Sequence, residues 1–287
     1  MDRAKIAVGI AIALLCASCS GPRRIVVGSK NFTEQLILGE IIAQHLERRL
    51  AQKVDRKLNL GGTLLAQQAL VSGQIDLYPE YTGTALTAIL KMPAAKGASQ
   101  VLERVRAEYR TRWGIEWLPP LGFDNTFAMV ISQDEARRGG YETLSQAAAR
   151  KPGWRLGIGY EFQTREDGLP GLMKTYQLPL AGSPKSMDLG LLYQALKQGQ
   201  VDMVAGSATD GVIPVLGLRI LRDDKSYFPP YQAAVVARAD RLSAVPGLRE
   251  ALAELSGKVS TEAMQKMNYK VDGEHRSIAD VAREFLK

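Results

Sequence analysis

Short apolar runs alternate with longer amphipathic segments along most of the chain, which is the pattern of an α/β protein. Residues 25–28 predict a buried strand, and apolar positions at helical spacing follow from Thr33 to His45. We expect further strands at residues 54–60, 74–77, 115–118, 121–131, 154–158, 201–205, 219–222 and 232–238. We expect further helices at residues 64–70, 85–90, 100–113, 144–150, 172–176, 189–198, 247–256, 260–267 and 277–285, and the last three should pack on the first half of the chain as a C-terminal cap.

The pattern QALxxGQ[IV]D occurs twice, at residues 68–76 and 194–202. Both copies predict a helix, a glycine that ends it and a following strand. Continuing the alignment without a gap places Tyr81 opposite Ser207 and Thr84 opposite Asp210. We interpret the repeat as a duplicated α/β unit, which implies two similar lobes with one strand-end loop each. Chance recurrence of a common helix–turn–strand pattern is the alternative.

Residues 78–84 (YPEYTGT) lie between a predicted strand and a predicted helix. Ligands of α/β proteins bind at the carboxyl ends of strands, where helix N-termini offer free N–H groups. A tyrosine at such a place offers a ring face to a cation and a hydroxyl to a hydrogen-bond partner. We therefore expect this stretch, and Tyr81 in particular, at the centre of a binding site.

Two basic residues stand at similar junctions. Lys30 follows the first strand and precedes a helix that Asn31 or Thr33 can cap. Arg165 lies in residues 159–168, which predict a loop between a strand and a helix. The guanidinium fork suits a carboxylate, so both side chains are candidate ligands of an anion. A solvated lysine and a surface ion pair are the alternative interpretations.

The formal charge of +7 changes this picture little, because the basic residues are scattered and alternate with acids. Nucleic acid is therefore only weakly indicated as a partner, and we expect none. The 287 residues suffice for a sizeable core in one or two domains.

The N-terminus predicts export. Arg3 and Lys5 precede an apolar run at residues 6–15 that is too short to span a bilayer. Small residues precede Cys19, as in a bacterial lipoprotein signal, so we expect residues 1–18 to be a signal peptide and Cys19 to be lipidated. An ordinary signal cleaved near this point is the alternative, and both place the protein in the periplasm or on the outer face of the cytoplasmic membrane.

The two cysteines, at positions 16 and 19, leave none for disulfides, thiol catalysis or metal sites in the rest of the chain.

Catalytic patterns are weak throughout. The chain has two histidines, His45 and His275, and neither is near a nucleophile or a metal-ligand pattern. No GxSxG, P-loop, GxGxxG or HExxH sequence is present. Asp76 and Asp202 occupy equivalent positions of the repeat, which favours a structural role over acid–base work. We therefore expect a binding protein without a cofactor or a metal, and not an enzyme.

Five motifs carry a resemblance to a known family. They are GSKNFTEQLILGE, GQIDLYPEYTGT, EFQTREDG, the TDG at residues 209–211, and DDKSYFPPY. Together they resemble the substrate-binding proteins of osmoprotectant ABC transporters of the glycine betaine/choline/carnitine type, which take up quaternary amines. The motifs occur in the family's order and span nearly all of the chain after the signal sequence.

The resemblance implies a two-lobed periplasmic-binding-protein fold of type II, with the ligand in the cleft between the lobes. Residues 23–123 plus 233–287 would form lobe one and residues 124–232 lobe two, with hinges near Asn125 and Gln232. The protein would be a monomer that delivers a quaternary-ammonium solute to an ABC permease. Matched motif by motif, the ligand carboxylate would meet Lys30, Thr84 and Arg165, and the ammonium would meet Tyr81, Phe127 and Tyr231. Residues lining the cleft would include Asn31, Glu34 and Ser207.

The chain departs from the family pattern at two places. Gly206 and Ser207 stand where many relatives have an aromatic residue before the TDG motif, and Phe127 stands where tyrosine is frequent. The departure predicts a gap at Ser207 or Gly206 in the aromatic box, which would admit a larger betaine or weaken the binding of a small one.

Two other functions stay open. A polar amino acid or another small zwitterion would need carboxylates around its free ammonium, for which Glu34, Glu80 and Asp124 are candidates. A ligand sensor or an enzyme on the same fold is the alternative from a different class.

Overall fold

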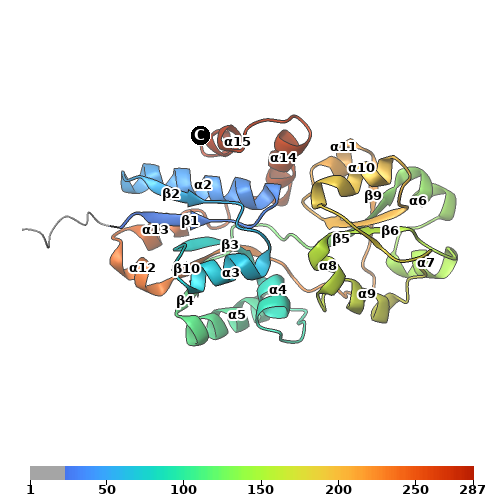
Figure 1. Cartoon of the computed structure of the whole chain (residues 1–287), viewed down its shortest axis with the longest axis horizontal. Coiled ribbons are helices and arrows are strands. Elements are labelled where there is room, and N and C mark those ends of the chain that lie inside the picture. Colours follow the sequence, from blue (N-terminus) through green and yellow to red (C-terminus); the bar gives the residue numbers. More distant parts are fainter. Residues whose placement is uncertain (1–22) are drawn as a thin grey trace, which may run out of the picture.

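Two separate five-stranded sheets, side by side in Figure 1, organise the chain into two α/β lobes. The computed structural model describes residues 23–287, so the predicted signal peptide and the lipidation of Cys19 lie outside the described residues. The separation of the sheets confirms the predicted two-lobed fold. Within the described residues, none of the helices combines the length and the apolar character that crossing a bilayer requires.

The sheet of the first lobe has the strand order β2-β1-β3-β10-β4. β1 pairs in parallel with β2 and β3, and β10 returns antiparallel between β3 and β4. The strands are β1 (Ile25–Gly28), β2 (Val54–Lys57), β3 (Leu77–Tyr81), β4 (Ile115–Trp117) and β10 (Ala233–Arg238).

The sheet of the second lobe repeats this plan with the order β7-β6-β8-β5-β9. β6 pairs in parallel with β7 and β8, and β5 lies antiparallel between β8 and β9. The strands are β5 (Phe127–Ser132), β6 (Leu156–Ile158), β7 (Lys185–Ser186), β8 (Met203–Ser207) and β9 (Leu218–Leu221). β3 and β8 are the strands of the two QALxxGQ[IV]D copies and hold the same place in their sheets, which supports the duplication.

Helices cover both faces of each sheet. In the first lobe they are α2 (Thr33–Leu50), α3 (Thr63–Val71), α4 (Thr82–Thr84), the π-helical turn η1 (Ala85–Ile89), α5 (Ala98–Trp113), α12 (Ala239–Ala244), α13 (Leu248–Ala253), α14 (Thr261–Asp272) and α15 (Ile278–Phe285). In the second lobe they are α6 (Gln133–Gly139), α7 (Leu144–Arg150), α8 (Tyr160–Thr164), α9 (Leu169–Tyr176), the 3₁₀ turn η2 (Leu189–Leu191), α10 (Leu192–Lys197) and α11 (Val212–Val215).

Each of the two sheets therefore has an apolar core on both of its faces. In the first lobe, Leu77 and Tyr81 join the core beneath α2, whereas Tyr78 joins the core beneath α5. This alternation is the two-residue period of a strand. It turns Tyr81 and its neighbour Glu80 to opposite faces of the sheet.

The segments that connect the lobes lie against each other. Asp124 and Gln232 form an isolated antiparallel bridge. The N–H of Tyr231 donates to the Asp124 carboxylate at 2.8 Å, and the N–H of Asn125 donates to the carbonyl of Tyr231 at 3.1 Å. The lobe boundaries and the hinge role of these segments stay predictions.

The strand of the repeated unit starts later than its sequence predicts. β3 begins at Leu77 rather than at Gln74, because Gly73 turns the chain with φ +73° and the N–H groups of Gln74 and Ile75 still donate to Ala69 at the end of α3. β8 begins at Met203, the equivalent position. The residues from Tyr78 to Tyr81 are therefore part of the strand, and the helical segment starts at Thr82, before the predicted residue 85.

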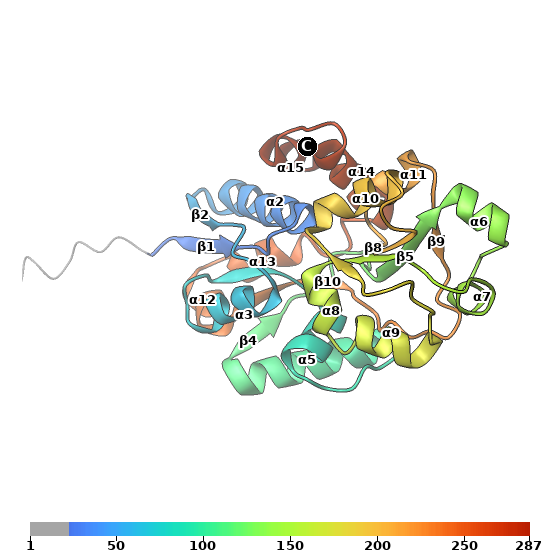
Figure 2. The same cartoon turned by 45° about the vertical axis from the view of Figure 1, so that its right-hand side comes forward.

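Three further expectations are wrong in detail. Phe32 is the N-cap residue of α2, without a side-chain hydrogen bond, so neither Asn31 nor Thr33 caps it. The Thr33 hydroxyl donates instead to Asp272 at 2.6 Å. The expected loop at residues 159–168 contains the short helix α8. Of the C-terminal helices, α14 packs on α2 but also contacts α11 of the second lobe (Figure 2), so it is more than a cap on the first lobe.

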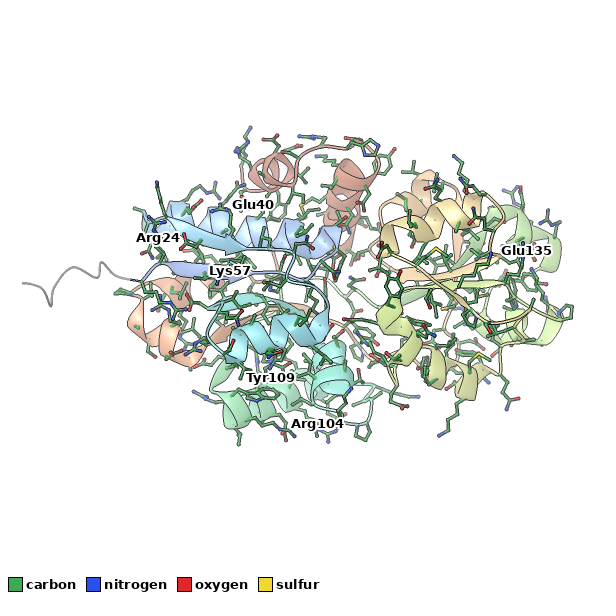
Figure 3. All side chains as sticks on the ribbon, in the orientation of Figure 1. Arg24, Glu40, Lys57, Arg104, Tyr109 and Glu135 are labelled. Atoms are coloured by element: carbon green, nitrogen blue, oxygen red, sulfur yellow. The ribbon has the colours of Figure 1, made fainter. Side chains whose placement is uncertain are left out.

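Charged side chains are spread over the outside of both lobes, as their scatter in the sequence predicts. Figure 3 labels Arg24 before β1, Lys57 at the end of β2, Arg104 on α5 and Glu135 on α6. These charged residues lie on elements of both lobes.

Candidate functional site

The junction between the lobes brings together strand ends of both sheets. Lys30 follows β1 and Tyr81 ends β3 in the first lobe, whereas Phe127 begins β5 and Arg165 follows α8 in the second. Because carboxyl ends of parallel strands meet at one edge of a sheet, the residues that the sequence singled out lie at facing edges.

Lys30 is buried and ion-paired. Its side chain is 3% exposed, and its Nζ lies 2.5 Å from Oε1 of Glu80, which is fully buried. The Tyr78 hydroxyl donates to the other oxygen of Glu80 at 2.8 Å. The Lys30 Nζ also lies 5.2 Å from the centre of the Tyr81 ring. Because an ammonium carries three N–H groups, the bond to Glu80 leaves donors for a further acceptor.

Arg165 is held by a bidentate pair with Asp167. Its Nε and Nη2 donate to the two Asp167 oxygens at 2.8 and 2.5 Å. Burial raises the pKa of Asp167, but the bonds to Arg165 outweigh it, so the pKa lies below its usual value. The Tyr231 hydroxyl also donates to Asp167, at 2.6 Å. This arrangement fixes the plane of the guanidinium and leaves its Nη1 edge for another partner.

Thr84 joins Arg165 to the first lobe. Its hydroxyl oxygen accepts a hydrogen bond from Nη2 of Arg165 at 3.2 Å. A hydroxyl that accepts in this way keeps its own hydrogen to donate. Thr84 and Arg165 together can therefore present donors to one anion.

Glu161, which the sequence reasoning missed, also crosses between the lobes. Its carboxylate accepts from the N–H and from the hydroxyl of Thr63, at 2.6 and 2.9 Å. Burial alone would raise the pKa of Glu161. The charges of Lys30 and Arg165 and the hydrogen bond from the Thr63 N–H together outweigh burial, so the pKa lies below its usual value. Glu161 is the first residue of the quoted motif EFQTREDG, but the sequence predicted a loop there and did not indicate a contact with the first lobe.

Aromatic rings surround the two cations. The Phe127 ring lies 5.5 Å from the ring of Tyr231, and Cζ of Arg165 lies 5.1 Å from the Phe127 ring. Phe162 and Phe228 pack on Phe127 at 4.9 and 5.8 Å, and Phe32 stacks on Tyr81 at 6.3 Å. The sequence reasoning missed these three phenylalanines as site residues, although all three lie within the quoted motifs.

Glu34 connects four segments at the junction. Its carboxylate accepts from the Tyr81 hydroxyl at 2.6 Å, from Nδ2 of Asn125 at 2.8 Å and from Nδ2 of Asn268 at 3.3 Å. Burial raises the pKa of Glu34 above its usual value. Asn268 comes from α14 and also donates to the carbonyl of Thr209 at 2.9 Å, so α14 reaches the site. No motif pointed to Asn268.

Ser207 lies opposite Phe127 in the pairing of β8 with β5, and it is half-buried. The predicted gap at Gly206 is wrong, because a Cβ there would lie 2.0 Å from the Tyr193 hydroxyl and 2.9 Å from Oδ2 of Asp210.

Asn31 is exposed, and its backbone N–H donates to the carbonyl of Gly61 at 3.0 Å.

These contacts define a two-lobed binding protein with cations, carboxylates and rings at the lobe junction. Over residues 23–287 the chain matches the OpuAC family, the substrate binding domain of ABC-type glycine betaine transport systems. The chain belongs to this family of substrate-binding proteins of ABC importers, which act outside the cytoplasm.

Named relatives cover most of the chain. The carnitine transport binding protein OpuCC of Listeria monocytogenes is 34% identical over 96% of this chain and 92% of that protein. The ergothioneine transport permease/ergothioneine binding protein EgtU of Helicobacter pylori is 35% identical over 92% of this chain but 47% of that protein. A crystal structure described as a glycine betaine/carnitine/choline ABC transporter superposes with a TM-score of 0.78 at 31% identity, covering 91% of this chain and 97% of that one.

Proposed function

We propose that this protein binds a solute with a trimethylammonium head and, in most cases, a carboxylate tail. Glycine betaine, carnitine, choline and related betaines are the candidate class. The relatives' names support it, because carnitine, ergothioneine and glycine betaine all carry both groups, and choline carries the head alone. The observation that carries the proposal is the set of donors left open on Arg165, Thr84 and Lys30 beside aromatic rings.

The carboxylate would lie between the lobes, against Lys30 and Thr84 from the first lobe and Arg165 from the second. The Nη1 edge of Arg165, the Thr84 hydrogen and the remaining Lys30 donors are the groups that would bind it. Glu80 and Asp167 hold the two cations in place, so these donors are oriented before the ligand arrives.

The ammonium head would meet the faces of Tyr81, Phe127 and Tyr231, with Asn31, Glu34 and Ser207 lining the cleft around it. A trimethylammonium has no N–H to donate, so ring faces are fitting partners, each worth about 0.5–2 kcal/mol. The buried carboxylate of Glu34 supports this placement, because among the described residues its partners are neutral donors rather than a cation.

The loaded protein would close its lobes around the ligand and deliver it to a membrane permease, acting as a monomer and without turnover. The contacts of Thr84 with Arg165 and of Thr63 with Glu161 show which groups meet when the lobes are together. Anchoring through a lipid on Cys19 would keep the protein near the permease. Replacing Cys19 with Ala should release it from the membrane fraction.

A calorimetric screen of the purified protein tests the proposal. Glycine betaine, carnitine, choline and ergothioneine form one group of ligands, and polar amino acids form the second. We expect binding within the first group. Binding of amino acids alone would favour the second candidate, a receptor for a zwitterion with a free ammonium, for which the buried Glu34 supplies an acceptor.

A further inference from the structure

Glu161 belongs to the second lobe, and both hydrogen bonds to its carboxylate come from Thr63 of the first. Both of its bonds to Thr63 lie at the first residue of α3. The approach is close, since a Cβ on the neighbouring Gly62 would lie 2.3 Å from Oε1 of Glu161. A glycine at this position therefore permits the contact.

The same carboxylate faces the open edge of Arg165. Oε2 of Glu161 lies 3.6 Å from Nη1, the nitrogen that Asp167 leaves free. The charge of Lys30 also acts on Glu161, and it is the largest of the influences that lower the pKa of this carboxyl against its burial. Of the two cations assigned to the ligand carboxylate, Arg165 thus already faces a carboxylate of the chain itself.

Exposure separates Glu161 from Asp167. The Glu161 side chain is 45% exposed, whereas that of Asp167 is 1% exposed. Glu161 can turn into solvent without burying an unpaired charge, but Asp167 cannot leave Arg165 at a low cost. Of the two carboxylates on this arginine, Asp167 is the one that positions it and Glu161 is the one that can be displaced.

We propose that Glu161 is an internal counter-anion of the carboxylate site and sets the preference between ligands with and without a carboxylate. This inference rests on the proposed function. A ligand carboxylate that approaches Nη1 of Arg165 meets the charge of Glu161 and has to displace it. A cation such as choline leaves Glu161 in place, so the residue disfavours betaines relative to choline.

The test is a calorimetric titration of wild type and Glu161→Gln with glycine betaine and with choline. The glutamine keeps an acceptor for Thr63 but removes the charge. We expect the preference for glycine betaine over choline, taken as the ratio of the two Kd values, to rise by about threefold to tenfold, the range of a partly exposed charge pair. Glu166→Gln is the matched control, because Glu166 lies in the same segment, is exposed and makes its hydrogen bond through its backbone carbonyl. Its ratio should stay within about twofold of wild type.

Two results would overturn the inference alone. An equal loss for both ligands in Glu161→Gln would show that the residue only holds the lobes together through Thr63. An unchanged ratio would show that its charge does not act on the ligand. Arg165→Ala in the same series separates this failure from that of the proposed function. If wild type binds neither ligand, or if Arg165→Ala leaves the ratio unchanged, the carboxylate site itself is wrong and the inference falls with it.

Discussion

The two lobes place a carboxylate at the same point of their sheets but recruit it from different residues. In the first lobe, Glu80 accepts from the Tyr78 hydroxyl at 2.8 Å and from the N–H of Tyr81 at 2.7 Å. In the second lobe, glycine stands at the equivalent position 206, and Asp210 reaches over it to accept from the Tyr193 hydroxyl at 2.5 Å and from the N–H of Ser207 at 2.8 Å. Tyr81 and Ser207 are equivalent in the repeat, so the same backbone N–H is satisfied twice.

The difference lies in the counter-charge. Glu80 pairs with the Lys30 ammonium, whereas the partners of Asp210 among residues 23–287 are neutral donors. Burial accordingly raises the pKa of Asp210 to about 6. Both lobes thus provide a carboxylate acceptor for the backbone N–H at the end of the repeated strand. They differ in whether a buried cation neutralises that carboxylate.

The ends of the repeated strands show the same contrast. Asp76 accepts from the N–H of Val26 at 2.9 Å, and Asp202 accepts from the N–H of Arg155 at 3.1 Å, so each ties its strand to a neighbouring one. Tyr81 and Ser207, at the far ends of these strands, differ in size and chemistry. Residues that build the sheet agree between the copies, and residues that reach the junction do not.

Removing the carboxylate of the first lobe should have the largest effect. Glu80→Gln leaves the Lys30 charge buried without its partner, which should lower the free energy of unfolding by about 3–5 kcal/mol at pH 7. Urea denaturation measures the loss. Asp210→Asn is the matched variant in the second lobe and should cost little at this pH, because no buried cation is left behind. Equal losses in both variants would remove the contrast between the lobes.

The second lobe should show a pH dependence that comes from Asp210. The folded-state pKa of about 6 exceeds the ordinary value of 3.8, so the folded protein binds this proton more tightly than the unfolded chain does. The stability contributed by this group is therefore present below about pH 4 and is lost as the pH rises through 6. Relative to wild type, Asp210→Asn should gain about 2 kcal/mol between pH 4 and pH 7. Urea midpoints across this pH range measure it, and parallel curves would contradict the assignment.

Removing the cation of the second lobe should separate the ligands. Arg165→Ala should weaken carboxylate-bearing ligands by at least about 1.5 kcal/mol, as for a charge-assisted hydrogen bond. Choline has no carboxylate and should lose little. Calorimetry with glycine betaine and choline measures both effects. Equal losses would place the carboxylate elsewhere.

Restoring an aromatic residue in the second lobe should have the smallest effect. Ser207→Tyr puts a ring at the position equivalent to Tyr81, opposite Phe127. It should tighten a small trimethylammonium ligand by about 1 kcal/mol, one cation–π contact, less any cost of crowding. The same variant should not favour a larger betaine. If both ligands gain alike, the ring does not fill a gap in the box.

The fold could be predicted because its signals are local and repeated. Alternation of apolar runs located most strands and helices, and the repeated QALxxGQ[IV]D pattern predicted two similar lobes. The predicted strand starts were too early in both copies, because the strands begin at Leu77 and Met203 rather than at residues 74 and 201. The turn after each helix ends at Asp76 or Asp202, and its hydrogen bonds to a neighbouring strand are long-range contacts that no local pattern shows.

The site could be predicted only in part, for a related reason. Lys30 follows β1, Tyr81 ends β3, and the segment that contains Arg165 follows β6, so their meeting at the lobe junction could be expected from the fold class. Asn268 reaches Glu34 from a helix near the end of the chain, which periodicity cannot reveal. Asp210 covers Gly206 because the chain turns back, with the N–H of Asp210 donating to the carbonyl of Ser207 at 3.0 Å. That turn fills a space which the sequence alone suggested was empty.

Tyr81 offers the most direct test of the central claim, that the lobe junction binds a quaternary-ammonium solute. Its side chain is 4% exposed, and its ring stacks on Phe32 and lies 5.2 Å from the Lys30 ammonium. The measurement is a calorimetric titration of wild type, Tyr81→Ala and Tyr81→Phe with one small and one large betaine. We predict that Tyr81→Ala weakens both ligands by about 1–2 kcal/mol and that Tyr81→Phe costs less, because the ring face survives. If Tyr81→Ala folds and binds both betaines as tightly as wild type, Tyr81 is a packing residue and the ligand site lies elsewhere.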